Sequence, residues 1–160
     1  MYDRVFSGRY LDRGCFRDED WAQVLLPTHR FASMDPAVFT ALQQAVDAAE
    51  DGNAVVMTEV EGPFEESVSL GFDRCQLDKA WGEGAFDALD SVVYGASASW
   101  GLFVAYDDVT CVGGTGAFMR QFLDGVPGGR EKLKKDFFDH AEWCVDPLVK
   151  EGILGRVGWA

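Results

Sequence analysis

The sequence has few basic residues for its length. Among 160 residues there are 14 lysines and arginines against 27 aspartates and glutamates, which gives a formal net charge of -13 at pH 7. Nucleic acids and anionic membranes are recognised through clustered lysines and arginines, so neither is expected as the main partner. The charge suits either a basic protein partner or a general need for solubility.

The chain also lacks long apolar runs and paired metal ligands. No stretch approaches the roughly 20 apolar residues that a membrane-spanning helix needs. The start, Met1-Tyr2-Asp3-Arg4, has no secretory-signal pattern, so we expect a cytoplasmic protein. The cysteines form no CxxC pair, which predicts reduced, mostly buried thiols and no metal or cofactor. They are Cys15, Cys75, Cys111 and Cys144.

What the chain does have is apolar content. Hydrophobic residues make up 48% of the sequence, with five tryptophans and twelve phenylalanines, which places it outside the disordered class. A length of 160 residues fits one domain, residues 1–160, that needs no disulfide or metal to hold its core.

Helical periodicity and cap residues predict several helices. The clearest begins at Asp35-Pro36, a cap followed by a first-turn proline, and ends at Gly52. Residues 18–26 and 84–94 also show helical patterns. Thr115 caps a further predicted helix, and Leu133 to Cys144 mark the last long one. The Asp146-Pro147 pair repeats the first cap pattern, and residues 153–159 are expected as an edge strand or packed coil.

Alternating residues predict two hairpins, one between residues 54–61 and 67–72 and one between 100–106 and 109–112. Strands in hairpins interrupted by helices indicate an α+β domain. We expect a largely antiparallel sheet of hairpins, with helices packed on one face and the other face partly wet. A doubly wound α/β fold through residues 72–100 is the alternative.

The negative charge is concentrated in the middle of the chain. Residues 35–90 hold 13 acidic side chains against only Arg74 and Lys79, so this stretch carries -11 of the total charge. Its later part interleaves acids with aromatics, as in interfaces where aromatic anchors bind and charges steer association. A solvated acidic face over core aromatics is the simpler alternative. The predicted partner-binding residues are Glu59, Glu61, Glu65, Glu66, Asp73, Asp78, Trp81, Glu83, Asp87 and Asp90.

Two other features could support chemistry. Gly113-Gly114-Thr115-Gly116 leads from a strand into a helix, a position where backbone N–H groups can bind phosphate. It lacks the lysine of a P-loop, so a tight turn with glycines at positive φ is the alternative. His140 and Cys144 lie one helical turn apart, but nothing completes a metal site or a nucleophile pair. No catalytic residue is therefore predicted. Acidic pairs such as Glu65-Glu66 lack the spacing of a calcium loop.

One stretch, residues 100–127, carries a family resemblance. It contains Trp100-Gly101-Leu102-Phe103, Asp107-Asp108, Val112-Gly113-Gly114 and a helix with Phe118, Met119 and Phe122. In this order it resembles the C-terminal part of small bacterial immunity proteins, which neutralise toxins of polymorphic or contact-dependent systems; beyond Pro127 the sequence departs from them. The resemblance implies an acidic cytoplasmic protein that blocks a cognate toxin, often a basic nuclease, without chemistry of its own.

Three hypotheses follow. The first is a non-enzymatic module whose acidic surface docks on a basic toxin or effector. The second is a small enzyme or phosphate-ligand-binding domain that uses the Gly113–Gly116 turn with His140 or Cys144. The third is a phage or secretion-system accessory protein that acts by assembly.

Overall fold

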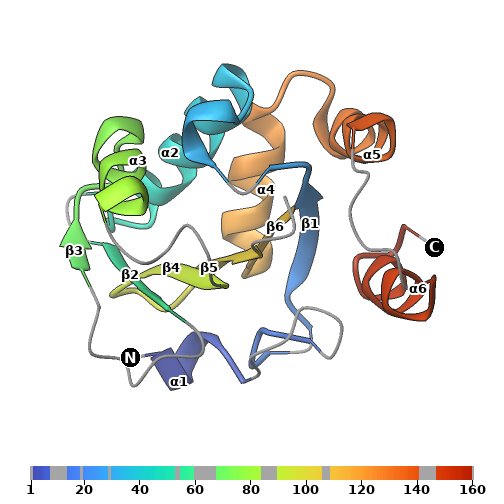
Figure 1. The fold of residues 1–160 in the computed structure, drawn as a ribbon, viewed down its shortest axis with the longest axis horizontal. Helices are drawn as coiled ribbons and strands as arrows, with labels where there is room; N and C mark the ends of the chain where they lie inside the picture. Colours follow the sequence, from blue (N-terminus) through green and yellow to red (C-terminus); the bar gives the residue numbers. More distant parts are fainter. Residues whose placement is uncertain are drawn as a thin grey trace.

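The computed structural model describes residues 2–7, 14–18, 20–28, 30–52, 55–59, 68–83, 90–105, 109–140 and 147–159. These residues form an α+β fold around one antiparallel sheet (Figure 1). The strands are β1 (Ala22–Leu26), β2 (Val55–Glu59), β3 (Val68–Leu70), β4 (Ser91–Gly95), β5 (Trp100–Ala105) and β6 (Val109–Gly114). Their spatial order is β1-β6-β5-β4-β2-β3, and each neighbouring pair is antiparallel.

Both predicted hairpins are confirmed. Strand β2 pairs with β3, with Met57 opposite Val68, and β5 pairs with β6, with Ala105 opposite Val109. The residues that join the strands of the two hairpins, 60–67 and 106–108, lie outside the described residues. The sheet is extended beyond the hairpins by β4, which joins them, and by β1 at the edge beside β6.

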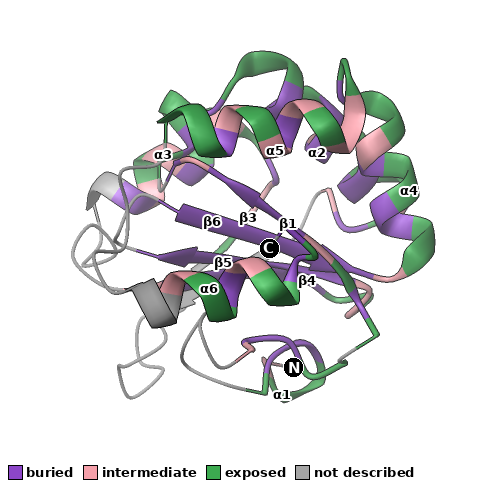
Figure 2. Ribbon diagram, turned by 90° about the vertical axis from the view of Figure 1, so that its right-hand side faces the viewer, coloured by how far each residue is buried: buried purple, intermediate pink, exposed green. Residues whose placement is uncertain are grey.

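The helices are α1 (Tyr2–Val5), a 3-10 turn η2 (Phe31–Ser33), α2 (Pro36–Ala48), α3 (Arg74–Glu83), α4 (Gly116–Gly125), α5 (Gly129–His140) and α6 (Pro147–Arg156). Helices α2, α3 and α4 lie together on one face of the sheet, as expected (Figures 1 and 2). The predicted caps are confirmed for α2 and α4. Asp35 accepts from the backbone N–H of Ala37 at 2.8 Å, and Thr115 accepts from that of Phe118 at 3.4 Å.

At strands β4, β5 and β6 the opposite face of the sheet is covered, where a partly wet face was expected. Strands β4, β5 and β6 are buried along their whole length. Helix α1 lies under them (Figure 1), and Phe16 packs against Gly101 of β5 and Gly113 of β6. The rings of Phe6 and Phe16 stack at 5.4 Å, and a Cβ placed on Gly113 would lie 2.4 Å from Phe16 Cε2. Glycines in the central strands therefore make room for this aromatic cover.

Three predictions of secondary structure were wrong. Residues 22–26 form strand β1 in place of a helix, because pairing with β6 satisfies their backbone and buries Val24, Leu25 and Leu26. Residues 91–95 likewise form β4, between β2 and β5. The expected edge strand or coil at residues 153–159 is instead the end of α6 followed by a turn. Helix α3 was not predicted, although Asp73 as a cap and the helical spacing of the apolar residues at positions 77, 80 and 81 could have indicated it.

Candidate functional site

The structure describes the side chains of four of the ten predicted partner-binding residues. These are Asp73, Asp78, Trp81 and Asp90. Glu59 ends β2 and Glu83 ends α3, with only their backbone described. The other four, Glu61, Glu65, Glu66 and Asp87, lie outside the described residues. Of the three described acids, Asp73 directly precedes α3, Asp78 lies within it and Asp90 directly precedes β4.

Two of these acids also have structural tasks. The Asp73 carboxylate accepts hydrogen bonds from the backbone N–H groups of Cys75 and Gln76, at 3.0 and 3.2 Å, and so caps the start of α3. The Asp78 carboxylate accepts from the backbone N–H of Ala32 at 3.0 Å, which ties α3 to η2. Asp73 remains exposed and Asp78 partly exposed, so both still add negative charge to this surface.

The aromatic residues of this region belong to the core. Trp81 is only 2% exposed and meets Phe31 edge to face, with ring centroids 6.2 Å apart. Phe72 lies between Phe39, stacked at 5.7 Å, and Trp100, edge-on at 5.5 Å. The position of Trp81 does not support its predicted role as a surface anchor. It holds α3 against the rest of the fold and thereby fixes the acidic side chains above it.

Arg74, one of the two basic residues of the 35–90 stretch, contacts the core. The Arg74 guanidinium donates to the carbonyl oxygen of Met34 at 2.9 Å and lies 4.7 Å above the Phe39 ring centroid. It therefore packs inward against α2 and its cap. Lys79 is the second basic residue of the 35–90 stretch and is exposed on α3.

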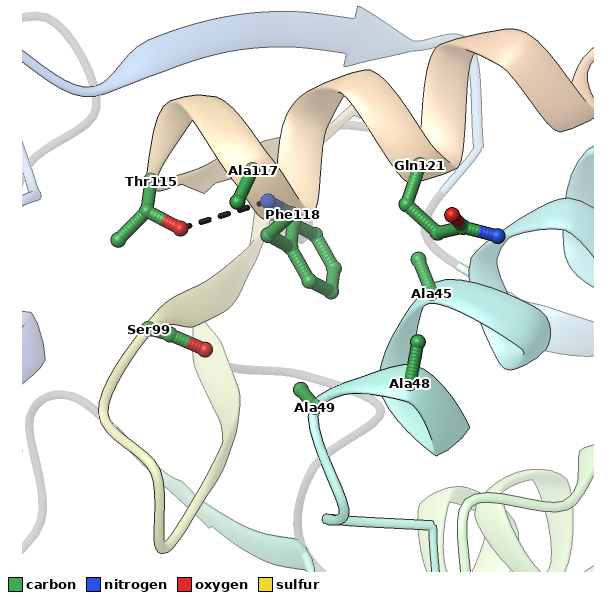
Figure 3. Close-up of a pocket in the computed structure, with 8 residues that line it drawn as sticks. All are labelled: Ala45, Ala48, Ala49, Ser99, Thr115, Ala117, Phe118 and Gln121. Atoms are coloured by element: carbon green, nitrogen blue, oxygen red, sulfur yellow. Dashed lines mark hydrogen bonds between the residues drawn. The ribbon is translucent and has the colours of Figure 1, made fainter.

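A cleft opens at the opposite end of α2, between that helix, the start of α4 and the β4–β5 turn. It has a volume of about 340 Å³ and is mostly apolar (Figure 3). Ser99 and Thr115 contribute hydroxyl groups, and Gln121 lies beyond the Phe118 ring. The lining residues are Ala45, Ala48, Ala49, Ser99, Thr115, Ala117, Phe118 and Gln121.

A buried carboxylate supports the wall of this cleft. Asp51 is 4% exposed and accepts three hydrogen bonds: from Ser97 N at 3.1 Å, Ser97 Oγ at 2.5 Å and Trp100 Nε1 at 2.9 Å. Ser97 Oγ is in turn 2.8 Å from Ser99 Oγ. The network locks the β4–β5 turn to the end of α2. Sequence reasoning missed Asp51, since it counted only as one more acid in the charged stretch.

The Gly113–Gly116 turn reaches the cleft through Thr115, and its glycines do not supply the positive φ values that the tight-turn alternative required. None of the three is at positive φ. A Cβ on Gly114 would lie 2.8 Å from the Phe118 ring and 2.9 Å from the Ser99 carbonyl oxygen, whereas a Cβ on Gly116 would meet nothing within 4 Å. Gly113 and Gly114 are therefore explained by close packing of the strand.

The described residues do not bring His140 to this cleft. His140 is exposed at the end of α5, with Nδ1 2.9 Å from the carbonyl oxygen of Asp136, and is not among the lining residues. Its predicted neighbour Cys144 lies outside the described residues. Within the described ranges, no three histidine, cysteine or acidic side chains are grouped closely enough to hold a metal ion.

In the part of the chain that the structure describes, no helix has the length and apolar character to span a bilayer. Searches against protein-family models, curated proteins and solved structures found no match.

Proposed function

We propose that this chain is a non-enzymatic, cytoplasmic binding protein whose acidic surface docks on a basic partner, in the manner of an immunity protein that inhibits a toxin. The observation that carries the proposal is the charge of residues 35–90, which hold -11 of the chain's -13. Charge of one sign on one region attracts an oppositely charged partner and speeds its association.

The packing of Arg74 supports this proposal. Because its guanidinium lies on Phe39 and bonds to the Met34 carbonyl, it does not act as a counter-ion for the exposed acids. Exposed acids in the described part of the stretch include Asp47, Glu50 and Asp73. Among the described acids of the stretch, Asp35 lies 3.4 Å from Lys132 Nζ, which also pairs with Asp136.

The first test compares two double charge reversals. Glu65→Lys with Glu66→Lys changes the predicted surface, and Glu131→Lys with Glu151→Lys changes the net charge equally on α5 and α6, which lie across the molecule from α3 (Figure 1). Asp73 is left intact because its substitution would also remove the α3 cap. The partner is captured from the native host on the immobilised protein, identified by mass spectrometry and purified.

The expected partner is a basic protein whose association slows about tenfold with the first variant and little with the second. Its association should also slow as salt is raised, because salt screens exposed charges. Equal effects of the two variants, salt-independent binding or an acidic partner would contradict the proposal. Self-assembly in gel filtration without a captured partner would favour the accessory-protein hypothesis.

The cleft favours a second candidate, a binding site for a small, partly apolar molecule. Its floor is made of alanines and Phe118, and Ser99 and Thr115 offer hydroxyls at one side. Ala48→Leu would fill part of this space from the exposed side of α2. Thermal shifts with inorganic phosphate and a panel of nucleotides would test the site. A shift that Ala48→Leu abolishes would favour this candidate, and the absence of any shift would argue against it.

A further inference from the structure

The β4–β5 turn carries a chain of hydroxyl groups that runs from the buried Asp51 carboxylate to the cleft. Ser97 Oγ donates to Asp51 Oδ2 at 2.5 Å, and Ser97 Oγ lies 2.8 Å from Ser99 Oγ. Asp51 is 4% exposed and does not line the cleft, whereas Ser99 does. Two hydroxyls thus connect a buried charge to the wall of the cleft.

The hydrogens along this chain point in one direction. An ionised carboxylate only accepts hydrogen bonds, and a serine hydroxyl has one hydrogen and two lone pairs. Because Ser97 donates its hydrogen to Asp51, the hydrogen between the two serines must come from Ser99. The backbone N–H of Ser99 also donates to Ser97 Oγ, at 3.2 Å, so both lone pairs of Ser97 are used. The hydrogen of the Ser99 hydroxyl is therefore already bonded, and this group offers the cleft only lone pairs.

Thr115 has the complementary hydrogen-bonding state. Its backbone N–H donates to the Ser99 carbonyl oxygen at 2.9 Å, so the two residues are neighbours. Thr115 Oγ accepts from the backbone N–H of Phe118, and within the described ranges no acceptor is bonded to its own hydrogen. Both hydroxyls lie on the same side of the cleft (Figure 3). This side therefore offers an acceptor at Ser99 and a donor at Thr115.

The lining favours an uncharged ligand. Beside the two hydroxyls it consists of four alanines, the Phe118 ring and the Gln121 amide. An anion would face the lone pairs of Ser99 and the Asp51 carboxylate behind them, with no lysine or arginine in the lining to offset the repulsion. A cation would lose its hydration among the alanines without forming an ion pair, because three donors already enclose Asp51.

We propose that the cleft binds a small uncharged alcohol, whose apolar body lies on the alanines and Phe118 and whose hydroxyl donates to Ser99 Oγ. A hydroxyl suits this place because it also accepts, as the Thr115 donor requires. Asp51 and Ser97 act as positioning residues: they do not touch the ligand, but they fix the direction of the Ser99 hydrogen. This inference rests on the second candidate function and narrows it to one class of ligand, so inorganic phosphate should not bind.

A set of ligands that share one apolar body tests the class. 2-Phenylethanol, phenylacetate and 2-phenylethylamine differ at their polar end, which at pH 7 is a hydroxyl, a carboxylate and an ammonium. Each is titrated into the ¹⁵N-labelled protein and followed by NMR at the backbone amides of α4 and the β4–β5 turn. We expect the alcohol to bind about tenfold more tightly than either ion, the effect of one unmatched buried polar contact. Ala48→Leu, which fills part of the cleft, should abolish binding of all three.

Ser97→Ala tests the direction of the hydrogens without changing the lining. It removes the acceptor of the Ser99 hydrogen, which is then free to point into the cleft as a donor. The preference for the alcohol over phenylacetate should therefore fall about fivefold to tenfold. Gln121→Ala is the control, because it changes the lining and leaves the hydroxyl chain intact, and it should keep the preference of the parent protein. An unchanged preference in a folded Ser97→Ala protein would contradict the role of the chain.

Failure of this inference can be distinguished from failure of the cleft as a binding site. If none of the three ligands binds, the second candidate function and the inference are both overturned. If phenylacetate or 2-phenylethylamine binds at least as tightly as the alcohol, the inference alone is overturned and the cleft remains a ligand site. The comparison among ligands uses the unaltered protein, so it decides the question even where Ser97→Ala folds poorly.

Discussion

The indole N–H of Trp100 donates a hydrogen bond of 2.9 Å to Oδ2 of Asp51, and both side chains are buried. Asp51 follows the end of α2 and Trp100 begins β5, so the bond joins two segments that are far apart in the sequence. Gly95 makes this possible, because any Cβ there would lie 2.1 Å from the Asp51 carboxylate. Burying this carboxylate costs little free energy while its three hydrogen bonds are intact. Removing the carboxylate is costly, because the buried donors would then have neither water nor a protein acceptor.

We therefore predict that Asp51→Ala lowers the free energy of unfolding by about 3 kcal/mol, because it leaves the Trp100 N–H and Ser97 donors without an acceptor. Asp51→Asn should cost less, since its carbonyl oxygen still accepts. Urea unfolding followed by tryptophan fluorescence measures both. Asp47→Ala is the control, because this exposed carboxylate on the last turn of α2 should change stability by under about 0.5 kcal/mol. Similar losses at both positions would contradict the role given to Asp51.

Helix α2 and the two hairpins could be predicted because their signals are local. Asp35 caps α2 through residues two and three positions away, and the hairpins follow from alternation on each side of a turn. Strands β1 and β4 lack such a signal. Both contain short apolar runs that a strand buried on two faces and a helix share, and only their neighbours in the sheet decide between the two. Asp18, which resembled a helix start, accepts from Asp20 N in a turn.

In the candidate site, too, local sequence signals could be predicted and long-range contacts could not. Counting charges located the acidic stretch without any structure. The burial of Trp81 depends on Phe31, fifty positions away, and the task of Asp51 depends on Ser97 and Trp100. Neither relationship leaves a pattern in the sequence near the residue itself. Long-range packing therefore decides which members of an acidic, aromatic stretch face solvent.

The cap of α2 predicts a dependence of stability on pH. The backbone N–H of Ala37 above all, with that of Val38 and the Lys132 ammonium, holds the pKa of Asp35 below its ordinary value of 3.8. Because the folded-state pKa is the lower one, protonation favours the unfolded chain. The stabilisation is complete above about pH 5 and is lost as the pH falls through the folded-state pKa.

We expect Asp35→Ala to cost about 1 kcal/mol at pH 7, and Asp35→Asn to cost less because asparagine also caps helices. Both should show a shallower loss of stability in acid than the parent protein. Unfolding in urea at pH 7, 5, 4 and 3 measures this. Asp124→Asn, at the exposed end of α4, alters the net charge equally and serves as control. An acid profile that Asp35→Asn leaves unchanged would exclude this carboxylate as its source.

Gly113 and Gly116 allow packing to be separated from ligand binding in the same turn. A Cβ on Gly113 would lie 2.4 Å from Cε2 and 2.7 Å from Cδ2 of Phe16, so Gly113→Ala should push the aromatic cover off the sheet. We expect it to lower the free energy of unfolding by about 1 to 3 kcal/mol, the usual cost of overpacking a core. Gly116→Ala faces open space in the first turn of α4 and should be neutral or stabilising by up to about 1 kcal/mol.

Urea unfolding compares the two variants, and hydrogen exchange at β5 and β6 should rise only in Gly113→Ala. A large loss of stability in Gly116→Ala would show that this glycine meets a constraint that packing does not supply. Gly116 does not line the cleft, so Gly116→Ala should leave a ligand-induced thermal shift unchanged, whereas Ala48→Leu should abolish it.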